Sequence, residues 1–153
     1  MNCLVRNATI NDWEAVIKIM NQVQNMHVEW RPDIYKPNNN IIPIDTFKKI
    51  VNDDTLFVAE ADGVVVGVIE IMFQRIENPS LVTRNVIFID SMAVDEKYRG
   101  TGIGHLLFEK VKQIKEQKHF DGIELQVNVK NKAAYEMYSK YGFTEQSINM
   151  ELL

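Results

Sequence analysis

A glycine-rich turn between an apolar run and a helical segment constrains this chain more than any other feature. The turn reads Arg99-Gly100-Thr101-Gly102-Ile103-Gly104, follows a run that ends at Val94, and opens a helical pattern over 103–117. A helix start presents unpaired backbone N–H groups and the positive end of the helix dipole. Glycines leave no Cβ in the way, so the backbone can approach an anion closely. The sequence therefore predicts a phosphate site at this turn.

Charge and composition limit the partners of such a site. The 153 residues carry a formal net charge of −4 without a dominant basic face, which argues against a nucleic-acid partner. Lys97 and Arg99 supply positive charge in the turn itself. No apolar run reaches about 18 residues, and Met1 to Arg6 lacks the core of a secretory signal, so we expect no membrane span and a cytoplasmic location. Cys3 is the only cysteine, which excludes an intrachain disulfide and a thiolate metal cluster.

Hydrophobic periodicity predicts one domain over 1–153 in which strands and helices alternate. Thr9 and Asp12 form a capping box at the first helix, Asp62-Gly63 joins two β-rich runs as a hairpin, and Gly142 ends the last helix. We expect strands over 2–6, 55–60, 64–73, 85–94, 123–127 and 143–152, and helices over 10–25, 46–51, 103–117 and 131–141. This order is typical of an α/β fold, a mixed sheet with helices on its faces.

Burial patterns add three expectations. The strand over 85–94 is apolar apart from Asp90 and Ser91, so it should be central and buried on both faces. Residues 27–40 contain Pro32, Pro37 and three consecutive asparagines, and should form a long loop of the kind that is often functional. The helix over 103–117 should bury a stripe formed by Ile103, Leu106, Leu107, Val111 and Ile114.

The spacing of the glycines excludes two common phosphate sites. A P-loop requires a lysine followed by Ser or Thr after its last glycine, and His105 and Leu106 stand there instead. A dinucleotide fingerprint requires Gly-x-Gly-x-x-Gly, whereas this turn has Gly100-x-Gly102-x-Gly104. A plain tight turn is the structural alternative to a phosphate site.

The surviving match, Arg99-x-x-Gly102-x-Gly104, resembles the pyrophosphate loop of the GNAT superfamily of N-acetyltransferases. Downstream, Asn131-x-x-Ala134-x-x-x-Tyr138 with Gly142-Phe143 resembles the C-terminal motif of that family. The strand Asp90–Val94 resembles the acyl-CoA strand of that family. The N-terminal pattern Arg6-x-Ala8-Thr9-x-x-Asp12 resembles the usual beginning of its sequences. The resemblance covers essentially the whole chain. It implies a GNAT-like fold, with a mixed and mostly antiparallel sheet of six to seven strands flanked by about four helices.

The resemblance implies acetyl-CoA as cosubstrate and no metal. Backbone N–H groups of the turn would bind the CoA pyrophosphate, and the backbone of the preceding strand would pair with the pantetheine amides. These residues are Met92, Ala93, Val94, Arg99, Gly100, Thr101, Gly102, Ile103 and Gly104. Asn131 resembles the polar residue that contacts the CoA arm. Asn131 is equally suited to be a helix N-cap, and both roles can hold together.

Tyr138 resembles the tyrosine that points at the thioester sulfur and is commonly assigned as the general acid. Without the resemblance, a tyrosine on an inner helix face would be a core aromatic. A phenol has a pKa near ~10 and a thiol near ~8.5, so the departing thiolate is the weaker base. A hydrogen bond to the developing charge can therefore replace full proton transfer.

Acetylation of an amine also requires a base, because an alkyl ammonium has a pKa of about 10.4. Asp90 is the first candidate, since apolar neighbours would raise the pKa of its carboxyl by desolvation. The alternative is that Asp90 binds backbone N–H groups at a strand bulge. Glu70, Glu124 and His27 are further candidates.

The expected reaction is acetyl transfer to a primary amine of a small molecule, peptide or protein. Direct attack in a ternary complex is expected because Cys3 lies far along the chain from the predicted site. Glu29, Trp30, Tyr35 and Glu70 are candidates for contacting a cationic acceptor, although a solvated loop with packed aromatics would look the same. A non-catalytic CoA-binding sensor or interaction module is the alternative function. The expected partner is the amine acceptor, and the sequence is compatible with a monomer or a homodimer.

Overall fold

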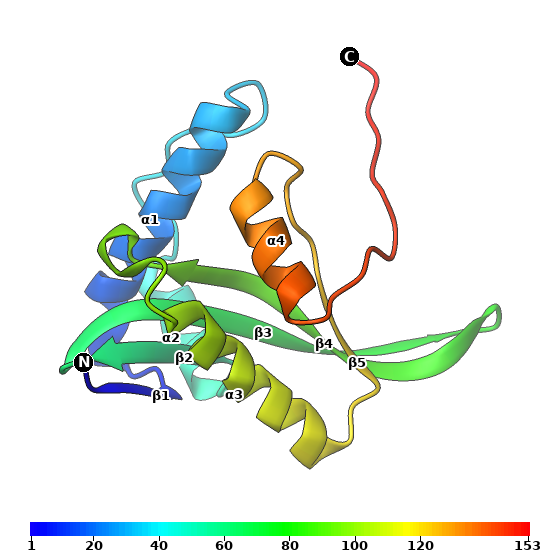
Figure 1. Ribbon diagram of the computed structural model, residues 1–153, viewed down its shortest axis with the longest axis horizontal. Helices are drawn as coiled ribbons and strands as arrows, with labels where there is room; N and C mark the ends of the chain where they lie inside the picture. Colours follow the sequence, from blue (N-terminus) through cyan, green and yellow to red (C-terminus); the bar gives the residue numbers. More distant parts are fainter.

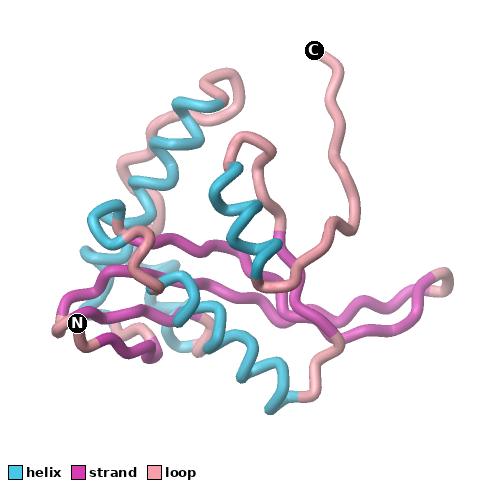
Figure 2. Tube along the Cα trace, in the orientation of Figure 1, coloured by secondary structure: helices cyan, strands magenta, loops and turns pink.

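The computed structural model describes residues 1–153 as one sheet with helices on both faces (Figure 1, Figure 2). The strands are β1 (Cys3–Asn7), β2 (Leu56–Ala61), β3 (Val64–Asn78), β4 (Leu81–Val94) and β5 (Gly122–Leu125). The helices are α1 (Trp13–Trp30), α2 (Ile44–Asn52), α3 (Ile103–Lys118) and α4 (Lys132–Lys140), with short 3-10 helices η1 (Ile10–Asp12) and η2 (Glu96–Tyr98). The mixed α/β class is confirmed, but the sheet has five strands rather than six or seven.

The strands lie in chain order across the sheet, from β1 to β5. All neighbours are antiparallel except β4 and β5, which α3 joins as a crossover. β4 therefore has neighbours on both sides, as its apolar sequence predicted. The hairpin at Asp62-Gly63 is also confirmed: both residues have positive φ, +50° and +82°, which is the signature of a type I′ turn.

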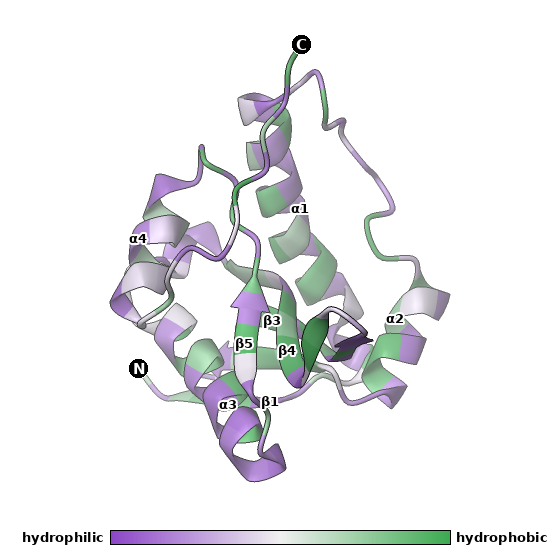
Figure 3. Cartoon of the chain, turned by 90° about the vertical axis from the view of Figure 1, so that its right-hand side faces the viewer, coloured by the Kyte–Doolittle hydropathy of each residue, from purple (hydrophilic) through white to green (hydrophobic).

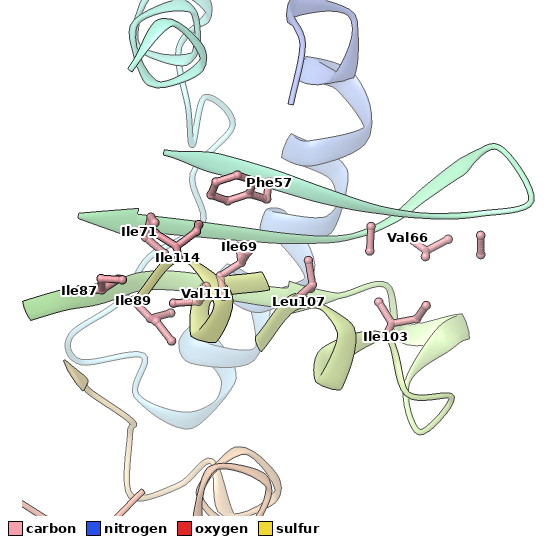
Figure 4. Close-up of a cluster of buried hydrophobic side chains, with 12 residues drawn as sticks. Phe57, Val66, Ile69, Ile71, Ile87, Ile89, Ile103, Leu107, Val111 and Ile114 are labelled. Atoms are coloured by element: carbon pink, nitrogen blue, oxygen red, sulfur yellow. The ribbon is translucent and has the colours of Figure 1, made fainter. Parts of the chain in front are cut away.

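Hydrophobic cores cover both faces at the middle of the sheet. On one face α3 buries Ile103, Leu107, Val111 and Ile114 against β-strand residues that include Ile69, Ile71, Ile87 and Ile89 (Figure 4). On the other face α1 and α2 bury Val16, Ile19 and Phe47 against Val58, Val68 and Ala93. Gly67 allows α3 to approach closely, because a Cβ at this position would lie 2.8 Å from Cγ2 of Ile103.

The first two helices differ from the predicted bounds. α1 continues to Trp30, so the beginning of the expected loop over 27–40 is helical. The helix ends there because Arg31 precedes Pro32, and a residue before proline disfavours the α region; Arg31 has a φ of −141°. α2 begins at Ile44 with Pro43 as its N-cap, rather than at Thr46 with Asp45 as the cap. No helix in the structure combines the length and apolarity needed to cross a membrane.

β3 and β4 form a longer ribbon than the sequence predicted. Their pairing continues to Asn78 and Leu81, so only Pro79 and Ser80 form the turn, and the ribbon projects beyond the sheet (Figure 1). The side-chain oxygen of Asn78 accepts the N–H of Ser80 at 2.8 Å, which closes the turn. Most of residues 74–84, which lie between the two predicted strands, are therefore strand.

The end of the chain does not form the predicted strand over 143–152. Thr144–Leu153 makes no backbone hydrogen bond and leaves the sheet (Figure 1). An extended segment becomes a strand only where a neighbour accepts its backbone N–H groups, and this segment has none. The strand predicted over 123–127 is also shorter and ends at Leu125.

One residue of the predicted stripe on α3 is wrong. Leu106 is 37% exposed, and Phe108 is buried in its place. The reason is a second contact surface that the helix pattern alone does not reveal. Phe108 stacks on Tyr141 with ring centroids 4.5 Å apart, so α3 also packs against the end of α4.

Candidate active site

The predicted phosphate turn lies between η2 and α3. The buried Asp95 accepts the N–H of Lys97 at 3.0 Å and so caps η2 where the chain leaves β4. Gly100 and Gly102 have φ angles of +76° and +91°, which other residues rarely adopt. A Cβ at either position would meet nothing within 4 Å. These two glycines set the shape of the turn, and the space beside them is open to a ligand.

α3 begins directly after this open space. The N–H groups of Ile103, Gly104 and His105 donate to no group of the protein, as expected for the first turn of a helix. Free N–H groups at the positive end of a helix dipole are suited to binding an anion. The missing side chain of Gly104 allows close packing, because a Cβ there would lie 3.3 Å from both Cε of Met92 and Sδ of Met137.

β4 and β5 separate beyond Ile89. They pair only from Val86 with Gly122 to Ile89 with Leu125. β4 continues to Val94 with β3 as its partner on one side. The backbone groups of Met92 and the N–H of Val94 point away from β3 and have no strand partner, whereas the C=O of Val94 accepts the Nε–H of Arg99 at 3.1 Å. The groups without a partner are open to pairing with the amides of an extended ligand.

Tyr138 reaches this opening from α4. Its hydroxyl donates to Sδ of Met92 at 3.6 Å, and its ring makes edge contacts with Tyr141 and Phe143. Burial raises the pKa of Tyr138 to about 12, with a smaller contribution from Tyr141. The phenol therefore remains protonated near neutral pH and presents a hydrogen-bond donor between β4 and α4.

Asn131 stands at the N-terminus of the same helix. Its side-chain oxygen accepts the N–H of Ala134 at 3.2 Å, so Asn131 is the N-cap of α4. The cap fixes the start of the helix that carries Tyr138.

Two carboxylates lie at a bulge in the adjoining part of the sheet. Glu70 pairs with Ser91, and strand alternation places it on the same face as Val68, beside α1. Asp90 is the extra residue of the bulge, because the pairing passes from Ser91 to Ile89. Burial, and secondarily the charge of Asp90, raises the pKa of Glu70 to about 7.

The expectation that Asp90 is buried among apolar neighbours is wrong. Asp90 is exposed, whereas the residues on either side of the bulge, Ile89 and Ser91, are buried and half-buried. The strand bulge given as the alternative for Asp90 is present, although no backbone N–H donates to its carboxylate. The extra residue breaks the alternation of inward and outward side chains. Of the further base candidates, Glu124 is paired with Arg84 at 2.5 Å.

The acceptor candidates fall into three separate places. Trp30 and Tyr35 pack on His27, with ring centroids 5.6 and 4.8 Å away, and burial lowers the pKa of His27. Glu29 lines a polar hollow of about 320 Å³ together with Arg99 and four residues of α1 and η2: Gln22, Asn25, Met26 and Glu96. Glu70 lies in neither group.

Two contacts near the site had no sequence signal. The side chain of Met92 contacts the Tyr138 hydroxyl, although the resemblance concerned only its backbone. Gln22 accepts the N–H of Glu96 at 2.9 Å and links α1 to the phosphate turn. Both join residues far apart in the chain, so no local pattern predicts them. No group of three or more His, Cys, Asp or Glu side chains is arranged to hold a metal ion.

Known proteins resemble this chain over most of its length. A family model described as "Acetyltransferase (GNAT) family" matches residues 20–143. An N-alpha-acetyltransferase of Sulfurisphaera tokodaii is 32% identical over 152 residues, which cover 94% of this chain and 81% of that protein. An uncharacterized N-acetyltransferase of Methanocaldococcus jannaschii is 34% identical over 97 residues, 63% of this chain, and the match spans only 42% of that protein.

Solved structures share the fold. A mutant of the BH1408 protein of Bacillus halodurans has a TM-score of 0.88 and 30% identity, with 98% of each chain covered. AAC(6')-Iy, solved in complex with a bisubstrate analog of CoA and an acetylneamine, has a TM-score of 0.77 at 17% identity, with 100% of this chain and 98% of that chain covered. The glycine turn, the opening beside β4 and these similarities together show that the chain belongs to the GNAT family of acetyltransferases.

Proposed function

We propose that this protein transfers the acetyl group of acetyl-CoA to a primary amine by direct attack in a ternary complex, with the α-amino group of a peptide as the preferred acceptor. The observation that carries the proposal is the Tyr138 hydroxyl at Met92 of β4, with Glu70 on β3 opposite the preceding residue of β4, Ser91. The Tyr138 hydroxyl is a protonated donor, and Glu70 has a pKa of about 7.

The donor side follows from the phosphate turn. The free N–H groups of Ile103, Gly104 and His105 would hold the CoA pyrophosphate. The backbone groups of Met92 and the N–H of Val94 would pair with the pantetheine amides. The remaining turn residues, Arg99 to Gly102, would surround the phosphates, and Asn131 would contact the CoA arm from the start of α4. This path brings the thioester toward Tyr138.

Tyr138 would donate a hydrogen bond to the sulfur as the carbon–sulfur bond breaks. Its pKa of about 12 lies well above the ~8.5 of a thiol, so the thiolate would leave without taking the phenolic proton. The role of Tyr138 is therefore to stabilise developing charge.

Glu70 would accept the proton of the attacking amine, directly or through one water molecule. An α-ammonium group has a pKa of about 7.7–8.0 and a lysine ammonium about 10.4. Each unit of pKa difference corresponds to about 1.36 kcal/mol. Proton transfer to a carboxylate of pKa about 7 therefore costs about 1 kcal/mol from an α-ammonium and about 4–5 kcal/mol from a lysine ammonium. This difference favours the α-amine, and the name of the Sulfurisphaera tokodaii relative agrees.

Asp90, the base candidate of the sequence, takes a different role in this proposal. Its charge helps to raise the pKa of Glu70, which makes Asp90 a positioning residue for the base. Direct attack remains the expected route, because Cys3 lies on β1, at the opposite edge of the sheet from β5.

The test is release of thiol from acetyl-CoA with three acceptors: a peptide with a free N-terminus, its Nα-blocked version containing lysine, and a polyamine. We expect kcat/KM to be at least about 10-fold higher for the free N-terminus, and to rise with pH through about 7 as Glu70 loses its proton. Glu70→Gln should lower kcat about 100-fold or more. Asp90→Asn should move the pH midpoint downward with a smaller loss of rate.

Several results would count against the proposal. Equal rates for lysine and α-amine would remove the acceptor preference, and unchanged kinetics in Glu70→Gln would remove the base. Acetyl-CoA that stabilises the protein but is never consumed with any acceptor would favour a non-catalytic CoA-binding module.

A further inference from the structure

Only the first half of α1 is anchored deeply in the core. Val16 and Ile19 are its fully buried residues, and both belong to the core cluster that contains Ala93 of β4. The helix continues from there to Trp30, and its last turns rise away from the sheet (Figure 1, Figure 3). A helix end with few buried contacts moves at a lower free energy than the core. The position of this end therefore depends on the other contacts that it makes.

The end of α1 and the segment after it are tied together as residues 24–36, called the acceptor arm here. Nε2 of Gln24 donates to the C=O of Lys36 at 2.8 Å. Tyr35 stacks on His27 with ring centroids 4.8 Å apart. These contacts fold the segment back onto the last turns of the helix. The acceptor arm carries three of the four acceptor candidates: Glu29, Trp30 and Tyr35.

A hollow of about 320 Å³ separates the acceptor arm from the phosphate turn. Its walls are Asn25, Met26 and Glu29 on the side of the arm, and Glu96 and Arg99 on the side of the turn. Gln22 also lines the hollow, and its side-chain oxygen accepts the N–H of Glu96 at 2.9 Å. This is the only hydrogen bond between α1 and residues 95–102. The link between the two sides therefore depends on one side chain.

The turn is itself held by few buried contacts. None of the residues of η2 is buried, so polar contacts supply much of its anchorage. Asp95 caps η2 from within the turn, and Gln22 contacts it from α1. An anion bound by the free N–H groups after the turn would restrict the same stretch of backbone.

We propose that Gln22 is a positioning residue that couples the binding of CoA to the binding of the acceptor. CoA at the phosphate turn would fix the N–H of Glu96, and the hydrogen bond to Gln22 would then restrict the motion of the acceptor arm. The acceptor peptide would bind to an arm that is already ordered. The inference rests on the proposed function, because it takes the arm as the site that contacts the acceptor.

The size of the coupling is limited by the bond that carries it. Coupling between two ligands is reciprocal, so a bound peptide must strengthen the binding of CoA by the same factor. One intramolecular hydrogen bond accounts for at most about a 10-fold change in an equilibrium constant. We therefore expect a coupling factor of about 3 to 10.

The first experiment is hydrogen exchange of the full chain with and without CoA, which needs neither an acceptor nor acetyl transfer. In the natural chain, CoA should slow the exchange of the amides of the acceptor arm by about 3- to 10-fold. Gln22→Met keeps the length of the side chain but lacks the carbonyl oxygen, so CoA should slow only the turn and α3. Gln22→Glu restores an oxygen acceptor and should restore the effect on the arm.

Asn25→Leu is the matched control. Asn25 lines the same hollow from α1, but its side chain makes no hydrogen bond. This variant should behave as the natural chain in both experiments. Thermal unfolding would verify that all three variants fold.

The second experiment measures the coupling factor by calorimetry. The affinity for CoA is determined with and without a peptide that has a free N-terminus, and no reaction occurs because CoA carries no acetyl group. The ratio of the two affinities should be about 3 to 10 in the natural chain and in Gln22→Glu, and about 1 in Gln22→Met. A general loss of stability would not change this ratio, because both affinities are those of the same variant.

Two results would overturn the inference. Slowed exchange of the arm in Gln22→Met would mean that CoA contacts the arm directly, and an arm unaffected by CoA in the natural chain would mean that the two sides are independent. The proposed function fails separately. A protein that shows the coupling but never consumes acetyl-CoA would contradict acetyl transfer and retain the role of Gln22, whereas rapid acetyl transfer with a coupling factor of about 1 would exclude Gln22 alone.

Discussion

Individual side chains acquire their chemistry here from positions that local sequence does not encode. Asp90 and Glu70 are far apart in the chain and are brought together by a bulge between β3 and β4. The sequence named Asp90 as the first candidate for the base and Glu70 as a further one, with a strand bulge at Asp90 as the alternative. The bulge is present, but its effect on which side chains face inward could not be derived from the apolar run. The N-cap position of Asn131 and the inward-facing position of Tyr138 were predictable, since capping and helix periodicity are local properties.

Tyr138→Phe is expected to lower kcat by about 10- to 100-fold, because a hydrogen bond to a developing charge contributes about 1.5–3 kcal/mol. The affinity for acetyl-CoA should change little, since the ring contacts with Tyr141 and Phe143 remain. Steady-state kinetics and calorimetry of acetyl-CoA binding measure the two quantities. Tyr135→Phe is the matched control, because this tyrosine lies on α4 but binds the exposed Glu145. A wild-type rate in Tyr138→Phe would exclude the residue from the mechanism.

Elements are more predictable than their ends. The type I′ turn, the start of α3 and the stop at Gly142 all depend on residues that are adjacent in sequence, and all are as predicted. The true ends of α1, β4 and β5 depend on a proline two residues after Trp30, on the ribbon partner, and on where β5 leaves β4. The separation of β4 from β5, on which the opening depends, is a tertiary property that no local pattern predicts.

Two glycine turns offer a matched test of the phosphate site. Gly102→Ala and Gly63→Ala both place an alanine at positive φ, +91° and +82°, and each should cost about 1–2 kcal/mol of unfolding free energy. Only Gly102→Ala should also weaken acetyl-CoA binding, by about 10-fold or 1.4 kcal/mol, because the added methyl group enters the open space beside the turn. Thermal unfolding and calorimetry measure the two effects. Equal affinities in the two variants would argue that the turn does not hold the cofactor.

At the scale of the whole molecule, an ionic cluster joins three elements near the start of the chain. Arg6 on β1 donates two hydrogen bonds to Asp12 on η1, at 2.8 and 2.9 Å, and another to Glu60 on β2. The hydrogen bonds from Arg6 hold the pKa of the buried Asp12 below its usual value. The sequence named Arg6 and Asp12 only as part of a motif, and their pairing gives this motif a structural reason.

Asp12→Asn should lower the unfolding free energy by about 2 kcal/mol, because Arg6 loses its charged partner but keeps Glu60 and partial solvent contact. The folded-state pKa of Asp12 lies below the unfolded one, so its contribution is complete above about pH 4 and is lost as pH falls through the lowered value. Urea unfolding between pH 2 and 7 should therefore show a weaker acid dependence in the variant. Asp33→Asn, at an exposed pair with Arg31, is the control. An unchanged acid dependence in Asp12→Asn would contradict this account.

The shallow burial of α4, which carries Tyr138, determines how readily this helix opens locally. None of the residues of α4 is fully buried, whereas α3 buries five side chains. Segments anchored by few buried contacts open at a lower free energy than the whole domain, and their amides exchange with solvent first. We therefore expect α4, one wall of the opening beside β4, to open more readily than α3. A long ligand can enter between β4 and α4 when α4 moves away from the sheet. A ligand bound there would slow the hydrogen exchange of the α4 amides.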